Sequence, residues 1–361
     1  MNRPALLVLR ALGLGDLLTA VPALRALAAA FPDHERALAT TEALAPLAMQ
    51  TGAIHRVIPA RPLESIAWAA PPPDVAVNLH GKGPRSHAAL LALSPARLIA
   101  FAHEDVPESR GGPEWRADEH EVARWCRLLD ESGVPADPSR LDLEPPFGGP
   151  LFQAVGATIL HPGAASAARR WPVERWATVA AELARRGEKI AITGDPKEID
   201  LAHRIALGAG LPEDTVIAGR TSLVDLARAV AAARRVVCGD TGVAHLASAL
   251  STPSVVLFGP TPPAWWGPPA SPHHRALWAG EMGDPHADEP SSGLLRIAPH
   301  DVIRALDELP GAPSAGGRVR ALLRTSAGSR ARVARSVLSD TPTPVPLPPG
   351  GSPVARREAR R

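Results

Sequence analysis

Short apolar runs alternate along the chain with longer segments in which apolar residues recur every three or four positions. The run ALLVLR at residues 5–10 predicts a buried strand, and the apolar positions from Leu17 to Phe31 predict a helix. A second strand is predicted at residues 74–79, and a helix that stops at a glycine is predicted at residues 121–133. Strands that alternate with helices in this way predict parallel sheets built from right-handed βαβ units.

The pattern breaks between residues 140 and 152, where prolines and glycines predict a linker. Beyond it, five strand-like runs are separated mostly by helix-like segments. They are ATIL at 157–160, KIAITGD at 189–195, DTVIAG at 214–219, RRVVCGD at 234–240 and PSVVLFGP at 253–260. We therefore predict an α/β protein in which two Rossmann-like domains, residues 1–145 and 153–310, face each other across a cleft.

The length of 361 residues agrees with two domains of ~150 residues each and a remainder. The chain has no run of ~18 apolar residues and no signal-peptide pattern, so we expect a cytoplasmic protein. Its two cysteines, Cys126 and Cys238, lie in predicted helix and strand segments. This placement indicates buried thiols rather than a disulfide framework or a zinc site.

Basic residues are concentrated at the end of the chain. Residues 312–361 contain ten arginines against Asp340 and Glu358, a net charge of +8; because the whole chain carries +2, the first 311 residues carry −6. The proline- and glycine-rich part cannot build a core, so we predict that residues 311–361 form a disordered, solvated tail. The alternative is a basic helix that makes peripheral contact with the inner face of the plasma membrane. We expect no nucleic-acid partner.

Each polar cluster of the chain follows a predicted strand. In open parallel sheets, ligands bind beyond the carboxyl ends of the strands, where loops lead into helix N-termini. The first such loop contains Gly15 and Asp16; its glycines let the backbone approach a ligand, and the Asp16 carboxylate would face the cleft. Helix capping by Asp16 is the alternative. The loop lacks the third glycine of a dinucleotide-binding fingerprint.

The second loop, HPGAAS at residues 161–166, is followed by Arg169 and Arg170. Small residues such as Gly163 expose backbone N–H groups, and a guanidinium binds phosphate through two hydrogen bonds. This combination predicts a phosphate site, with an exposed basic turn as the alternative.

The third loop follows the strand at residues 234–239 and opens a helix with Asp240, Thr241 and Gly242. The N–H groups at the start of that helix would point at a bound diphosphate. His245, one turn into the helix, either bonds a phosphate or is a buried structural histidine. Asp240 is either a helix cap or an acceptor for a sugar hydroxyl.

A fourth loop, HGKGPRS at residues 80–86, carries Lys82 and Arg85. Two cations at a strand end would suit an acidic or phosphorylated acceptor. A solvated basic loop is the alternative.

Taken together, these motifs resemble those of glycosyltransferase family 9, the family of the ADP-heptose:lipopolysaccharide heptosyltransferases. The resemblance extends from about residue 3 to residue 310. The motifs that carry it are VLR, GD and PAL within residues 8–24, HPGA and RWP within 161–172, and GDTG, HLA and FGPT within 239–261. Their combination, order and spacing are specific to the family, whereas any one of them alone is not.

The resemblance implies a GT-B fold and inverting, metal-independent transfer of a heptose or related sugar. The donor would be a nucleoside diphosphate sugar, with ADP as the family's nucleotide, and the acceptor a cell-envelope glycan or glycolipid. The resemblance places the catalytic base on Asp16. It also places a donor site on residues of three loops, which are Gly15, Gly163, Arg169, Arg170, Asp240, Thr241, Gly242 and His245.

One departure from the family leaves the nucleotide and the sugar open, because Val224 stands where heptosyltransferases often carry a glutamate near the nucleoside. Two other functions also stay open. A GT-B-type nucleotide-sugar epimerase would show additional acid and base carboxylates in the donor domain. A non-catalytic nucleotide-sugar-binding protein would have no need of Asp16, so its presence favours an enzyme.

Overall fold

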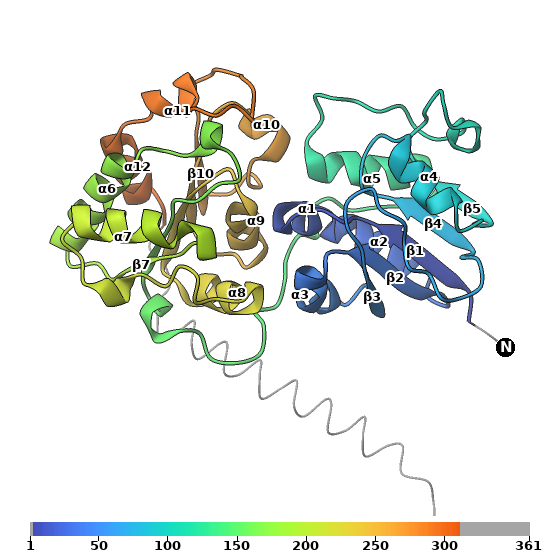
Figure 1. Cartoon of the computed structure of the whole chain (residues 1–361), viewed down its shortest axis with the longest axis horizontal. Helices are drawn as coiled ribbons and strands as arrows, with labels where there is room; N and C mark the ends of the chain where they lie inside the picture. Colours follow the sequence, from blue (N-terminus) through green and yellow to red (C-terminus); the bar gives the residue numbers. More distant parts are fainter. Residues whose placement is uncertain (1–2, 311–361) are drawn as a thin grey trace, which may run out of the picture. The chain divides into compact units, whose positions relative to one another are not determined.

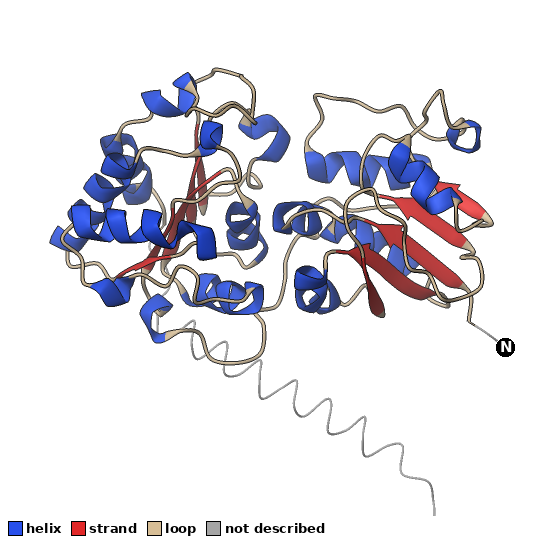
Figure 2. Cartoon of the chain, viewed as in Figure 1, coloured by secondary structure: helices blue, strands red, loops and turns tan. Residues whose placement is uncertain are grey.

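The computed structural model of the chain describes residues 3–310, which contain two parallel β-sheets of five strands each (Figure 1, Figure 2). Helices follow most of the strands, as the sequence pattern predicts. The α/β class is therefore confirmed. The predicted basic tail, residues 311–361, lies outside the described residues.

The first sheet has the strand order β3-β2-β1-β4-β5. Its strands are β1 (Ala5–Leu9), β2 (Glu35–Thr40), β3 (Arg56–Pro59), β4 (Val75–Asn78) and β5 (Arg97–Ile99). Leu6 and Val8 of β1 belong to one hydrophobic core, and Leu7 and Leu9 belong to another. Because both faces of the sheet are covered, its central strand is apolar throughout instead of alternating.

Helices α1 (Leu14–Thr19), α2 (Val21–Ala30), α3 (Ala45–Gln50), α4 (Arg85–Leu91) and α5 (Glu121–Glu131) accompany this sheet. The single helix predicted from Leu17 to Phe31 is wrong, because Ala20 separates α1 from α2. Pro22, in the first turn of α2, has no N–H to donate to the Leu18 carbonyl, and the Ala20 amide donates to the Leu17 carbonyl at 3.1 Å.

The second sheet has the strand order β10-β9-β8-β6-β7. Its strands are β6 (Thr158–His161), β7 (Ile190–Ile192), β8 (Arg235–Gly239), β9 (Ser254–Leu257) and β10 (His274–Leu277). Its helices are α6 (Val173–Arg185), α7 (Ile199–Gly208), α8 (Leu223–Ala232), α9 (Gly242–Ala249), α10 (Pro263–Trp266), α11 (Ser292–Arg296) and α12 (Pro299–Asp307). Short 3₁₀ turns are η1 (Glu42–Leu44), η2 (Pro107–Ser109), η3 (Phe152–Ala154), η4 (Ala167–Arg169), η5 (Pro196–Glu198) and η6 (Glu213–Thr215).

The strand predicted from DTVIAG is wrong. Within residues 214–219 only Val216 pairs, through an isolated parallel bridge to Ile192 of β7, and the fifth strand is β10. The segment begins inside η6 and ends at Gly219, which leaves no room for a longer ladder. Strand β10 carries His274 and Arg275 and is only partly buried, so its sequence lacks the apolar run of the other strands.

Each sheet has one point at which the order of the strands reverses. In the first sheet it lies between β1 and β4, and in the second between β6 and β8. The first sheet has the Rossmann order 3-2-1-4-5, and the second has the order 3-2-1-4-5-6 when the Val216 bridge is counted beside β7. In such sheets the ligand site lies at the carboxyl ends of the strands that flank this reversal.

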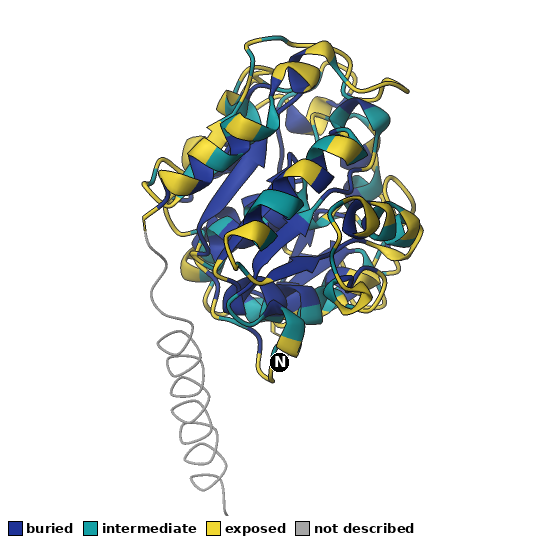
Figure 3. Cartoon of the chain, turned by 90° about the vertical axis from the view of Figure 1, so that its left-hand side faces the viewer, coloured by how far each residue is buried: buried dark blue, intermediate teal, exposed yellow. Residues whose placement is uncertain are grey.

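The central strands are buried and the helices expose one side, as Figure 3 shows. One hydrophobic core extends from Leu6 of the first sheet to Ile159 of the second. Residues 141–150 contain no helix or strand, in agreement with the predicted linker. The domain bounds 1–145 and 153–310 stay predictions. No helix within residues 3–310 is long and apolar enough to cross a membrane.

Candidate active site

The predicted polar clusters lie at the two points where the strand order reverses. Strand β1 ends just before Arg10 and the loop to Asp16, and β4 ends just before the loop at 80–86. In the second sheet, β6 leads into the loop at 161–170 and β8 leads into Asp240. The parallel sheets therefore bring each pair of loops to the same edge.

Asp16 is the third residue of α1, and its side chain is 27% exposed. Its Oδ2 atom accepts a hydrogen bond of 3.1 Å from the Gly13 amide, which closes the first turn of the helix. Its Oδ1 atom lies 3.5 Å from Nη2 of Arg10. Burial raises the pKa of Asp16 above its ordinary value, and the positive charge of Arg10 partly opposes that rise. Asp16 thus caps the helix and also remains accessible.

Arg10, the last residue of the VLR motif, lies behind Asp16, and no role of its own was predicted for it from the sequence. Its side chain is fully buried, and its Nε and Nη1 atoms donate to the backbone carbonyls of Asp16 and Leu79. Its Nη2 atom donates to Thr19 Oγ1 at 3.1 Å and to Glu121 Oε1 at 3.0 Å. One guanidinium therefore connects the end of β4, the start of α1 and the start of α5.

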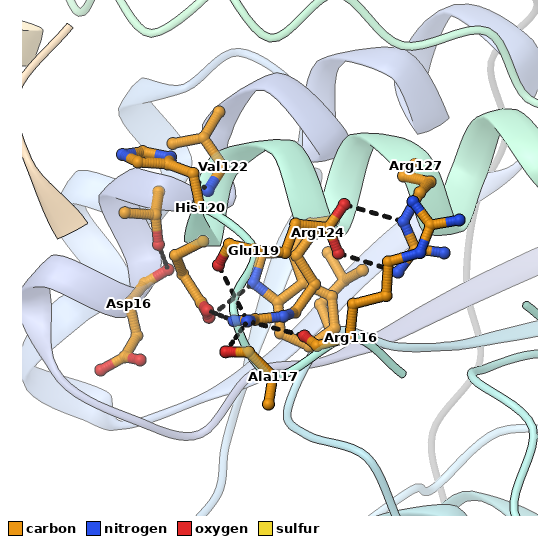
Figure 4. A network of polar contacts seen from close by, with 12 residues as sticks. Asp16, Arg116, Ala117, Glu119, His120, Val122, Arg124 and Arg127 are labelled. Carbon is orange, nitrogen blue, oxygen red and sulfur yellow. Dashed lines mark hydrogen bonds and ion pairs between the residues drawn. The ribbon is translucent and has the colours of Figure 1, made fainter. Parts of the chain in front are cut away.

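Glu121 opens α5 and is itself held by several donors. Trp125 Nε1 donates to Glu121 Oε1 at 2.8 Å, and Arg124 Nη1 donates to Oε2. Figure 4 shows the network, with Asp16 at its left end and Arg127 at its right end, where Arg127 forms an ion pair with Glu119. Since Arg10 and Glu121 are 111 residues apart, no local sequence pattern could have predicted their contact.

The start of α9 has unsatisfied hydrogen-bond donors. The amides of Thr241, Gly242 and Val243 have no hydrogen-bond acceptor among residues 3–310. Within the same range, the buried hydroxyl of Thr241 also lacks a partner. Free N–H groups at the positive end of a helix form a ready site for an anion.

Arg169 lies beside this helix start, whereas Arg170 does not. Nη1 of Arg169 donates to the Asp240 carbonyl at 3.2 Å. Arg170 is exposed, and its Nε donates to the Ala164 carbonyl at 2.9 Å. Burial raises the pKa of the Asp240 carboxyl to about 6, although Arg169 opposes that rise. The structure therefore brings only one of the two predicted arginines to the end of β8.

Gly163 has a neighbour that sequence reasoning missed. A Cβ atom at Gly163 would lie 1.9 Å from Oε1 of Glu198, so a larger residue there would have to displace the Glu198 side chain. Oε2 of Glu198 accepts a hydrogen bond of 2.9 Å from the Asp195 amide. Glu198 thus fixes the turn after β7 against the loop that follows β6.

The two halves of the site meet at Gly15. A Cβ atom at Gly15 would lie 2.8 Å from Cδ2 of His245, and one at Gly242 would lie 3.0 Å from the Gly15 nitrogen. The His245 ring also packs edge to face against Trp266, with centroids 5.8 Å apart. Burial lowers the pKa of His245 to about 4, so the ring is neutral at pH 7. These contacts favour a structural histidine, and its contact with phosphate stays a prediction.

A cavity of about 170 Å³ lies where α1, α5 and α9 approach one another. Most of its lining is apolar, and His120 and His245 both border it. Where Gly15 meets Gly242, the predicted cleft is closed by direct packing of α1 on α9.

Lys82 and Arg85 are exposed at the end of β4, where the sequence places them. Their loop is held by Asn78, whose buried amide donates to the Gly81 carbonyl at 3.1 Å and to Ser86 Oγ at 2.9 Å. A polar residue at the last position of a buried apolar strand was the signal that could have identified Asn78.

Among residues 3–310 no group of three or more histidine, cysteine, aspartate or glutamate side chains could hold a metal ion. The expected metal independence stays a prediction. Cys126 and Cys238 are buried free thiols, as predicted.

Comparison with known proteins places this chain among glycosyltransferases. The sequence pattern of glycosyltransferase family 9 (heptosyltransferase) matches residues 113–293, half of the chain. Lipopolysaccharide heptosyltransferase 2 of Escherichia coli K12 is 30% identical over 231 residues, which are 61% of this chain and 60% of that protein. The matches to curated relatives span between 27% and 60% of the relatives' length.

Solved structures agree in fold. A family 9 glycosyl transferase from Veillonella parvula superposes with a TM-score of 0.69 at 21% identity, over 86% of this chain and 98% of that one. Heptosyltransferase WaaC of Escherichia coli, solved with ADP, superposes with a TM-score of 0.61 at 21% identity, over 85% of this chain and 100% of that one. The predicted GT-B fold is therefore confirmed.

Proposed function

This chain belongs to glycosyltransferase family 9, and on that premise we propose that it transfers a sugar from a nucleoside diphosphate donor to a hydroxyl group of a cell-envelope glycan or glycolipid. The observation that carries the proposal is the packing of Gly15 against Gly242 and His245. Gly15 directly precedes Asp16 in α1, and Gly242 carries one of the α9 N–H groups that lack an acceptor among residues 3–310. A proton acceptor and an anion site are thus adjacent.

The donor site that we propose is the start of α9 together with Arg169. The amides of Thr241, Gly242 and Val243 and the Thr241 hydroxyl would donate to the diphosphate, and the Arg169 guanidinium would add positive charge. Heptosyltransferase WaaC was solved with ADP and with ADP-2-deoxy-2-fluoro heptose, and the curated relative is a heptosyltransferase by name, so ADP-heptose is the first donor to test.

The proposed reaction is an in-line displacement that inverts the anomeric carbon. An acceptor hydroxyl oxygen forms the new bond to C1 of the sugar while the bond from C1 to the diphosphate oxygen breaks. Asp16 takes the proton of that hydroxyl. The leaving nucleoside diphosphate gains negative charge, which α9 and Arg169 would stabilise without a bound metal.

The acceptor would approach the first sheet. Lys82 and Arg85 are exposed at the end of β4, next along the sheet edge to the loop that holds Asp16. Two exposed cations at that edge would attract a phosphorylated or acidic glycan.

The test is an Asp16→Asn variant assayed with ADP-heptose and an acceptor glycolipid. We expect donor affinity to stay within about twofold of the unmodified protein while turnover falls on the order of 10²- to 10⁴-fold, the usual loss when a general base is removed. Asp33→Asn, which changes an exposed aspartate away from the site, is the matched control and should keep full turnover. Donor binding without turnover in the unmodified chain would instead favour a non-catalytic binding protein.

A further inference from the structure

We propose that Arg10 and Glu121 are positioning residues of the transfer reaction: Arg10, held by Glu121, fixes the orientation and the charge of the Asp16 carboxylate. The proposal rests on the proposed function. It concerns two side chains that do not reach the substrate, because Arg10 is fully buried and the Glu121 side chain is 7% exposed.

Arg10 contacts both the backbone and the side chain of Asp16. The Nε–H group of Arg10 donates a hydrogen bond to the Asp16 carbonyl, and its Nη2 atom lies 3.5 Å from Oδ1 of the Asp16 carboxylate. Backbone and side chain of one residue are therefore held by one planar group. A lysine has three donors on a single atom and cannot reach both of these acceptors and the Leu79 carbonyl from one position.

Glu121 in turn holds Arg10 in position through an ion pair. The pair is joined at 3.0 Å, and the Arg10 guanidinium also stacks on the Trp125 ring, 4.8 Å from its centroid. Glu121 is fixed in turn by Arg124 and Trp125 of the same helix. The position of α5 therefore determines where the Arg10 guanidinium lies. Through its contacts with Arg10, the Asp16 side chain depends on α5 as well.

The charges of Arg10 and Glu121 affect the pKa of Asp16. The charged groups that act on Asp16 are Arg10 after β1 and Glu121 on α5. Two histidines lie near the same loop: His80 accepts the Ala11 amide, and His245 lies against Gly15. Burial lowers the pKa of both histidines, so neither carries charge at neutral pH. Arg10 lowers the pKa of Asp16 and Glu121 raises it, so the two side chains act on the proton acceptor in opposite directions.

The experiment compares Glu121→Gln, Arg10→Met and Arg10→Lys with the unmodified full chain. The titration of the Asp16 carboxyl is followed by ¹³C NMR of Asp-labelled protein and identified by its absence in Asp16→Asn. We expect the midpoint to move to lower pH in Glu121→Gln, which keeps the shape of the side chain, and to higher pH in Arg10→Met. The acid limb of kcat should move in the same directions, because only the ionised carboxylate accepts a proton.

Arg10→Lys keeps the charge and tests position alone. We expect kcat to fall on the order of 10- to 100-fold with KM for the donor changed less than about twofold, as for a slightly misplaced catalytic group. The matched control is Glu188→Gln, which alters the buried Arg235–Glu188 pair, joined at 2.5 Å. Arg235 is the first residue of β8, at the other end of that strand from Asp240. Glu188→Gln should lower thermal stability and leave the Asp16 titration unchanged.

Titration midpoints that stay fixed in Glu121→Gln, or that move in the same direction in Glu121→Gln and Arg10→Met, would overturn the proposal. If Arg10→Met does not fold, Glu121→Gln decides alone. A chain that shows the expected NMR shifts but consumes no donor would refute the proposed transfer activity and leave the control of Asp16 by Arg10 and Glu121 standing.

Discussion

Asp16 is held by few and weak contacts for a half-buried carboxylate. One oxygen accepts the Gly13 amide at 3.1 Å, and the other faces Arg10 at the long distance of 3.5 Å. A carboxylate bonded more strongly would be a poorer proton acceptor, because hydrogen bonds to the charged form lower its pKa. The loose contact with Arg10 keeps Asp16 in place without removing its basicity.

Gly15 is a residue whose absent side chain is part of the site. We expect Gly15→Ala to destabilise the protein by about 1–3 kcal/mol, the usual cost of added volume in a packed contact, and to reduce kcat. The reason is that its Cβ atom would meet His245, which is backed by Trp266. Denaturant unfolding and steady-state kinetics measure the two effects. Gly111→Ala, where a Cβ atom meets nothing within 4 Å, should change neither.

At the scale of elements, the site is formed where α1 and α9 start. Both helices follow the central strands of their sheets, and both begin at a glycine-containing turn. That arrangement was predictable, because β1 and β8 are mainly apolar runs followed by loops that contain glycine and aspartate. The contact of Arg10 with Glu121 and that of Gly163 with Glu198 were not, since each depends on tertiary packing.

Arg169 of η4 and the next residue, Arg170, provide a matched pair of variants that test the donor site. We expect Arg169→Met to weaken binding of ADP-heptose about 10- to 100-fold, since a hydrogen bond to a charged group contributes about 1.5–3 kcal/mol. Arg170→Met should change the affinity for ADP-heptose less than about twofold. The Arg170 side chain donates to the Ala164 carbonyl, whereas it is Arg169 that contacts Asp240. Isothermal titration calorimetry at one salt concentration measures both. Equal losses in the two variants would contradict the assignment of Arg169.

At the scale of the whole molecule, the repeated strand and helix pattern was enough to predict two parallel sheets. It failed at their edges. DTVIAG is apolar enough for a strand but begins in a 3₁₀ turn, and β10 is a true strand whose partly exposed sequence does not look like one. Edge strands are less buried than central ones, so their sequences carry less of the apolar signal.

The central claim is that Asp16 and α9 support one in-line displacement on a sugar attached to a diphosphate. The measurement that tests it most directly is the anomeric configuration of the transferred sugar, determined by ¹H NMR of the product formed from ADP-heptose. The account predicts a product with the configuration at C1 opposite to that of the donor. Transfer with retained configuration would contradict it, because a single in-line displacement always inverts the carbon at which it occurs.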